Sequence, residues 1–153
     1  TIDAAEWVGP YDDFKLGFYK VAKNYAYPGW WEGGPQLDLH INKKAYDSLS
    51  SEYKAIIEAA SSFAATDMQA RYDARNAAAL KNLVAGGAKL FPFPKDLMDA
   101  AFKESMALYD EIGAKNPGWK KIYADYSGFR KEANQWFRFT EARFDSYMQS
   151  AKL

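Results

Sequence analysis

The spacing of apolar and polar positions divides the chain into two unlike parts. Residues 1–42 contain short extended and turn-rich patterns, whereas residues 43–153 mostly repeat apolar side chains every three or four positions. The second spacing is typical of amphipathic helices. We therefore treat 1–42 and 43–153 as two segments of one structural unit, the first rich in loops and short strands and the second helical.

The first segment begins with a helix signal. Pro10 followed by Asp12 and Asp13 is typical of a first helical turn, because proline fits there and acids favour the positive end of the helix dipole. This pattern predicts a short helix over 10–17, with a further turn over 18–23.

A loop and a strand are expected next. Residues 28–35 contain three glycines and two prolines, so they are expected to form a loop after an extended segment at 25–27. Residues 36–42 alternate polar and apolar side chains, which predicts a half-buried strand. Its inward side chains would be Leu37, Leu39 and Ile41, and His40 would lie on its polar face.

The second segment is predicted to be helical almost throughout. Asn42 is expected to cap a short helix over about 43–49, and Ser50 or Ser51 to cap a long helix that ends near Val84, before two glycines. The elements expected after it are, in chain order, a short strand at 89–91, a helix from Pro94, a break over 113–118, a helical piece over 119–126 and a last helix over about 128–148.

The last expected helix carries apolar side chains on more than one face. Trp136, Phe139 and Tyr147 lie near one face, and Phe137, Phe144 and Met148 near another. A helix with apolar area on two sides is covered on two sides, either by two parts of its own domain or by a second chain. Its position at the end of the sequence slightly favours the second chain.

These elements indicate a helix-rich α/β protein whose sheet is incomplete. One alternating strand and two short ones are not stable unless they pair with one another or with strands from elsewhere. The chain starts abruptly, and it contains neither a leader-like segment nor an apolar run near the ~20 residues that span a bilayer. We therefore expect the C-terminal part of a larger mixed α/β protein.

Composition removes several classes of function. Lys plus Arg and Asp plus Glu number 20 each, and this zero net charge argues against a nucleic-acid binder. The absence of cysteine removes disulfides and thiolate metal sites, and one histidine cannot build a multi-histidine site. The 153 residues are enough for one domain with a sizeable core. Aromatic residues make up 17%, so much aromatic area must lie in a core, a site or an interface.

The candidate chemistry lies at two carboxylates that neighbour tryptophans in glycine-rich, non-helical segments. These are Glu6-Trp7 and Trp30-Trp31-Glu32. Carboxylate and backbone oxygens are the ligands of a hard cation such as Na⁺ or Ca²⁺, and indole faces suit the wall of a small flat ligand. Ordinary core tryptophans and solvated glutamates are the alternative explanation.

Other residues and motifs give weaker signals. Arg71 and Arg75, one helical turn apart, have the chemistry to grip a carboxylate, or else form salt bridges to Asp67 or Asp73. No phosphate-binding loop, dinucleotide fingerprint, nucleophile elbow or metalloprotease motif is present.

Three other readings stay open. The first is a sugar-binding module with Trp30 and Trp31 as a stacking platform. The second is a hydrolase with a Glu6–Glu32 acid–base pair. The third is a helical module that dimerises through its last helix.

Two long blocks resemble a known family. They are Glu6-Trp7-Val8-Gly9-Pro10-Tyr11-Asp12-Asp13 and Tyr27-Pro28-Gly29-Trp30-Trp31-Glu32-Gly33-Gly34-Pro35-Gln36. Both resemble the solute-binding proteins of tripartite ATP-independent periplasmic (TRAP) transporters, the DctP-type family, in the branch that binds 2-oxo acids and related monocarboxylates. The resemblance covers nearly the whole chain, although its helical remainder is generic.

The resemblance implies the C-terminal portion of a two-lobed fold like that of periplasmic binding proteins. Residues 1–42 would line the cleft between the lobes, and residues 43–153 would form a helical region with one long helix. The protein would be periplasmic and not an enzyme, with no catalytic residues. It would deliver a 2-oxo or 2-hydroxy monocarboxylate to the membrane permease subunits, and its C-terminal helix would exchange between the subunits of a homodimer.

The resemblance also implies a site. A Na⁺ or Ca²⁺ ion would bridge the solute, held by the carboxylates of Glu6 and Glu32 and the backbone carbonyl of Trp7. Trp7, Trp31 and Glu32 would contact the solute. The arginine that pairs with the solute carboxylate in this family, and a glutamine that contacts the metal, precede the Glu6-Trp7 block and have no counterpart here.

Overall fold

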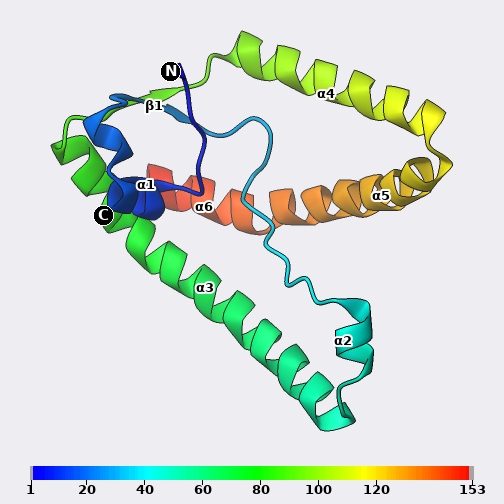
Figure 1. Ribbon diagram of the computed structural model, residues 1–153. Coiled ribbons are helices and arrows are strands. Elements are labelled where there is room, and N and C mark those ends of the chain that lie inside the picture. The colour runs from blue at the N-terminus through cyan, green and yellow to red at the C-terminus, as the bar shows by residue number, and fades with distance from the viewer. Residues whose placement is uncertain (1, 152–153) are drawn as a thin grey trace. The chain divides into compact units, whose positions relative to one another are not determined.

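The computed structural model describes residues 2–151. They form two compact units that divide between Met98 and Asp99, and each is described by itself. As the sequence predicts, the protein is rich in helices and contains a small sheet (Figure 1).

The first unit contains both strands and the longest helix. Its elements are, in chain order, α1 (Pro10–Leu16), a 3-10 turn η1 (Phe18–Lys20), β1 (Asn24–Tyr27), α2 (Lys43–Asp47), α3 (Ser51–Ala85), β2 (Lys89–Pro92) and the first turn of α4 (Lys95–Lys115).

Local capping sets the limits of the helices in this unit. The Asn42 side chain accepts a hydrogen bond from the Ala45 amide and begins α2, and the Ser50 side chain accepts one from Tyr53 and begins α3. These bonds satisfy amides that lack a partner within the helix. From Ser51 the helix runs unbroken for 35 residues (Figure 1) and ends at Gly86, so the predicted caps and length are confirmed.

β1 and β2 pair in parallel, with Asn24 opposite Lys89 and Tyr27 opposite Pro92. α2 and α3 make the connection between the two strands. The core lies where α1 packs against the C-terminal part of α3 (Figure 1). Its fully buried side chain is Leu83, with Ala79 and Ala88 beside it at 4% and 6% exposure. This core is smaller than the chain length predicts. Many large apolar side chains of the described residues are exposed and do not contribute to it.

A buried acid joins α1 to β1. The Asp13 side chain is 6% exposed, and its Oδ2 accepts a hydrogen bond from the Tyr25 hydroxyl at 2.6 Å. Burial raises the pKa of the Asp13 carboxyl above its ordinary 3.8, and the nearby charges of Asp12 and Glu6 raise it further, while the Tyr25 hydrogen bond acts in the opposite direction. Burial and the Asp13 carboxylate also raise the pKa of Tyr25.

The second unit consists of the remainder of α4, α5 (Pro117–Phe139) and α6 (Glu141–Ser150). Aromatic rings hold α4 against the start of α5. Tyr109 lies 5.8 Å from Trp119 and 5.0 Å from Tyr123, measured between ring centroids, and Trp119 stacks on Tyr123 with an interplanar angle of 9°. These contacts close the turn at Asn116, whose side chain caps α5.

The predicted strand over 36–42 is wrong. These residues have no regular secondary structure, and the side chains expected to face inward are 56%, 65% and 39% exposed at Leu37, Leu39 and Ile41. Alternation describes a strand only when a neighbouring strand pairs with it, and here β1 and β2 pair with each other. His40 is exposed on this irregular segment.

The predicted break over 113–118 is confirmed at Asn116 but is shorter than expected, and the break predicted before Gly128 is wrong. α4 continues through Gly113 to Lys115, and α5 continues through Gly128 to Phe139. A glycine within a helix costs only about 0.5–1 kcal/mol, so neither residue interrupts its helix. The break between α5 and α6 lies at Thr140, whose φ of −98° and ψ of −96° are not helical and whose hydroxyl donates to the Trp136 carbonyl.

Gly86 supplies a test of the packing between α3 and the 3-10 turn. A methyl group on Gly86 would lie 2.5 Å from a ring carbon of Tyr19, and the Tyr19 ring stacks on Phe14. We expect Gly86→Ala to lower the free energy of unfolding of the first unit by about 1–3 kcal/mol because the ring must move. Amide hydrogen exchange in α3 and β2 measures this loss.

Gly128→Ala is the matched control, since nothing lies within 4 Å of the added methyl group. It should stabilise α5 by about 0.5–1 kcal/mol. Unchanged exchange protection in Gly86→Ala would contradict the close approach of Tyr19.

Asp13 makes the stability of the first unit depend on pH. Between pH 3.8 and its raised folded pKa, the folded state keeps a proton that the unfolded state has lost, so stability falls as pH rises through this window. Asp13→Asn removes the titration and keeps an oxygen acceptor for Tyr25. We expect the stability of this variant to fall less than that of the wild type as pH rises. Hydrogen exchange in α1 and β1 from about pH 4 upward measures this difference. Parallel pH profiles for the two proteins would refute the assignment.

Candidate functional site

Glu6 and Trp7 lie in an irregular segment directly before α1. Both side chains are exposed, Trp7 by 53%. Gly9 has a φ of 153°, a value that favours glycine, and its carbonyl accepts the Asp13 amide at 3.0 Å. Because only Val8 and Gly9 separate Trp7 from α1, the position of this helix limits where the Glu6-Trp7 segment can lie.

Trp30, Trp31 and Glu32 lie in the loop that follows β1, as the sequence predicts. The Trp31 ring contacts Phe93 after β2, with 6.4 Å between centroids, and crosses so close to Gly29 that a Cβ there would lie 3.2 Å from it. The rings of Trp30 and Trp31 stand at 88° to each other. They therefore do not form a flat platform of the kind that would stack a sugar. Glu32 is exposed.

The structure places both glutamates in the first unit without joining them. No hydrogen bond or ion pair links Glu6 to Glu32, and no residue between 2 and 151 forms an ion pair with either. Residues 2–151 also contain no cluster of three or more His, Asp or Glu side chains that could hold a metal ion. The chemistry of the donors still fits a hard cation, since two carboxylates and the Trp7 carbonyl supply oxygens. Such an ion would need further oxygens from outside these residues.

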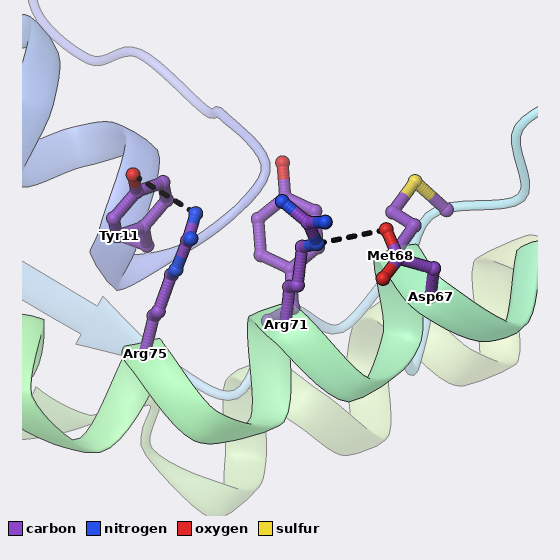
Figure 2. Close-up of a pocket in the computed structure, with 6 residues that line it drawn as sticks. Tyr11, Asp67, Met68, Arg71 and Arg75 are labelled. Atoms are coloured by element: carbon purple, nitrogen blue, oxygen red, sulfur yellow. Dashed lines mark hydrogen bonds and ion pairs between the residues drawn. The ribbon is translucent and has the colours of Figure 1, made fainter. Parts of the chain in front are cut away.

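A groove of about 210 Å³ lies between α1 and α3 (Figure 2). Its lining residues are Tyr11, Asp67, Met68, Arg71, Tyr72 and Arg75. The Nε of Arg71 lies 2.7 Å from Asp67, one helical turn away, which agrees with the salt-bridge alternative for this arginine. The guanidinium of Arg75 lies 5.2 Å from the Tyr11 ring centroid and donates to the Tyr11 hydroxyl at 3.3 Å (Figure 2). Both arginines thus make contacts within the protein.

Polar contacts beside this groove fix α1 on α3. The Tyr72 hydroxyl donates to Asp12 at 2.7 Å, and the Tyr11 amide donates to the Asn76 side chain at 3.0 Å. The hydrogen bond to Asp12 raises the pKa of Tyr72. Sequence reasoning placed Asp12 and Asp13 only in a first helical turn. It missed these contacts because their partners on α3 lie about 60 positions away.

Among residues 2–151, no helix is both long enough and apolar enough to cross a membrane.

Comparison with known proteins identifies the family. Residues 1–116 match the DctP model, described as bacterial extracellular solute-binding protein, family 7. The monocarboxylate 2-oxoacid-binding periplasmic protein of Nostoc sp. strain PCC 7120 is 44% identical over 152 residues, which are 99% of this chain and 42% of that protein.

Two solved structures are similar along nearly the whole chain. A TRAP transporter solute-binding protein from Bordetella bronchiseptica RB50 has a TM-score of 0.90 and 46% identity over 97% of this chain and 44% of its own. It is described as a mixed-occupancy dimer, with copurified calcium and picolinate in one active site and an apo site. A TRAP periplasmic solute-binding protein from Pseudoalteromonas atlantica T6c, with bound sodium and pyruvate, has a TM-score of 0.87 and 33% identity over 99% of this chain and 45% of its own.

The chain thus spans less than half the length of these relatives. The family model covers most of the chain itself, and the two sequence blocks that resemble TRAP solute-binding proteins both lie within the matched residues. The chain belongs to the DctP family, the bacterial extracellular solute-binding proteins of family 7.

Proposed function

We propose that the protein carrying this chain is the periplasmic solute-binding component of a TRAP transporter. It binds a small 2-oxo or 2-hydroxy monocarboxylate together with a metal ion and delivers it to the membrane permease subunits. The observation that carries the proposal is membership of the DctP family, together with similar proteins whose names or structures include 2-oxo acids, pyruvate and picolinate.

The ligands of the two similar structures share one chemical feature. Picolinate and pyruvate each carry a carboxylate next to a second donor, a ring nitrogen in one and a keto oxygen in the other. Each is accompanied by a cation, calcium or sodium. A carboxylate and an adjacent donor chelate one cation, so chelation together with cleft volume would select the solute. This selection would admit 2-hydroxy acids and disfavour carboxylates without a second donor.

The residues of this chain would supply part of that site. The carboxylates of Glu6 and Glu32 and the backbone carbonyl of Trp7 would hold the cation, since oxygen donors of this kind suit both Na⁺ and Ca²⁺. Trp7, Trp31 and Glu32 would contact the solute. The bound ion would offset the repulsion between the solute carboxylate and the two glutamates. Binding and release of the solute would require no catalytic residue.

The first test neutralises the two glutamates. In the full-length protein, Glu6→Gln and Glu32→Gln should each weaken calcium-dependent picolinate binding and sodium-dependent pyruvate binding by at least about tenfold, because each removes a charged ligand of the ion. Isothermal titration with and without the cation measures both effects.

Glu104→Gln is the control, because it removes the same charge from an exposed position on α4 in the second unit. Affinity equal to that of the wild type in Glu6→Gln or Glu32→Gln would exclude that residue from the site.

We further propose that α5 and α6 mediate a homodimer. A similar structure is described as a dimer, and the aromatic faces predicted for the last helix are exposed in this chain. The exposed fractions are 70% at Phe129, 59% at Trp136, 50% at Phe137, 78% at Phe139, 64% at Phe144 and 67% at Tyr147. Exposed apolar area of this extent is typical of a protein–protein interface, and a second copy would cover it.

The dimer proposal is tested by placing charge on this surface. Phe139→Glu combined with Tyr147→Glu should shift the protein from dimer to monomer, because two carboxylates would be buried without partners. Light scattering after size-exclusion chromatography gives the mass. Val21→Glu, at a position 88% exposed in the first unit, serves as the control. A double variant that remains dimeric at micromolar concentration would place the interface elsewhere.

A further inference from the structure

We propose that the Asp13–Tyr25 hydrogen bond positions the solute site, because it joins the helix behind the Glu6-Trp7 segment to the strand that leads into the Trp31-Glu32 loop. This inference rests on the function proposed above. It assigns a positioning role to two residues that need not touch the metal or the solute.

The short connection between α1 and the Glu6-Trp7 segment supports this role. Two residues separate Trp7 from Pro10, the first residue of α1. The Gly9 carbonyl accepts the amide of Asp13 itself, so Asp13 is bonded through its backbone to the segment that carries Glu6 and Trp7. A rotation or shift of α1 would therefore move both candidate ligands.

The connection between Tyr25 and the Trp31-Glu32 loop is also short. Tyr25 lies in the middle of β1, which is paired with β2 along its length. The chain passes from β1 directly into the loop of Trp31 and Glu32, where the Trp31 ring rests against Phe93, just beyond β2. β1 and β2 therefore form a fixed base for this loop, and Tyr25 belongs to that base.

The Asp13–Tyr25 hydrogen bond links these two connections. Among residues 2–151 it is the side-chain hydrogen bond that joins α1 to β1. Its length of 2.6 Å is that of a charge-assisted bond between a hydroxyl and a carboxylate. Asp13 is 6% exposed, so water competes poorly for this bond. Removal of the Tyr25 hydroxyl leaves a buried carboxylate without its donor and removes this side-chain link between α1 and β1.

The opposite side of α1 provides a matched comparison. There the Tyr72 hydroxyl donates to Asp12 at 2.7 Å, a bond of the same kind. It fixes α1 to α3 and not to β1, and it is supported by the Tyr11–Asn76 hydrogen bond and the Arg75–Tyr11 contact. Loss of the Tyr72 hydroxyl thus leaves other contacts that hold α1 on α3.

The experiment compares Tyr25→Phe with Tyr72→Phe in the full-length protein. Each variant removes one phenolic hydroxyl that donates to an aspartate of α1. We expect Tyr25→Phe to raise the dissociation constants for picolinate with calcium and for pyruvate with sodium by about 10-fold to 100-fold, the range for residues that orient metal ligands. Tyr72→Phe should change them by less than about threefold, because its bond is backed by others.

A third variant separates positioning from stability. Asp13→Asn combined with Tyr25→Phe removes the unpaired buried charge, so the thermal stability lost in Tyr25→Phe should recover in part. The hydrogen bond is still absent, and we expect the affinity to stay low. Recovery of affinity together with stability would show a merely structural role and overturn the inference.

Two further results are decisive. Wild-type affinity in Tyr25→Phe, or an equal loss in Tyr72→Phe, would refute the positioning role while the proposed function stands. Failure of the wild-type protein to bind either ligand with its cation would refute the proposed function and this inference with it.

Discussion

The hydrogen bond from Tyr25 to the buried Asp13 carboxylate is the interaction on which the arrangement of the first unit depends. Three contacts hold this unit together. α1 packs on α3, β1 pairs with β2, and the Tyr25–Asp13 hydrogen bond joins α1 to β1. Few apolar side chains are fully buried here, so the polar contacts carry a larger share of the specificity than they would in a domain with a thick core. A buried carboxylate accepts few alternative partners, which makes its one donor a strong constraint on position.

The long helix α3 gives these contacts a rigid support. Its caps at Ser50 and Gly86 are local, and its 35 residues form one unbroken helix. Tyr72 and Asn76 of α3 bind α1, and Leu83, nearer the C-terminal end of α3, is fully buried. The tyrosine–aspartate pairs on the two sides of α1 use adjacent acids, Asp12 and Asp13. A helix of seven residues is therefore fixed at two consecutive positions to two different elements.

Local chemistry explains which parts of the fold follow from sequence. Asn42 and Ser50 are caps whose action depends on residues three positions away, and both predictions are confirmed. The strand predicted over 36–42 fails because alternation does not say which strand lies alongside. Gly128 does not end a helix because its cost is small, and the real interruption at Thr140 has no strong local signal. The polar contacts of α1 were missed because they join residues 12 to 65 positions apart.

The sequence predicted the family of the candidate site, but the roles of its residues are untested. The block motifs predicted the family, which the comparison establishes, whereas the roles of Glu6, Trp7, Trp31 and Glu32 stay predictions. A physical argument nevertheless connects them to a cation. Neither glutamate has a cationic partner among residues 2–151, and two unpaired carboxylates would repel a carboxylate solute. If both line the solute site, a cation between them and the solute would offset this repulsion. A solute able to chelate that cation would then gain most from its presence.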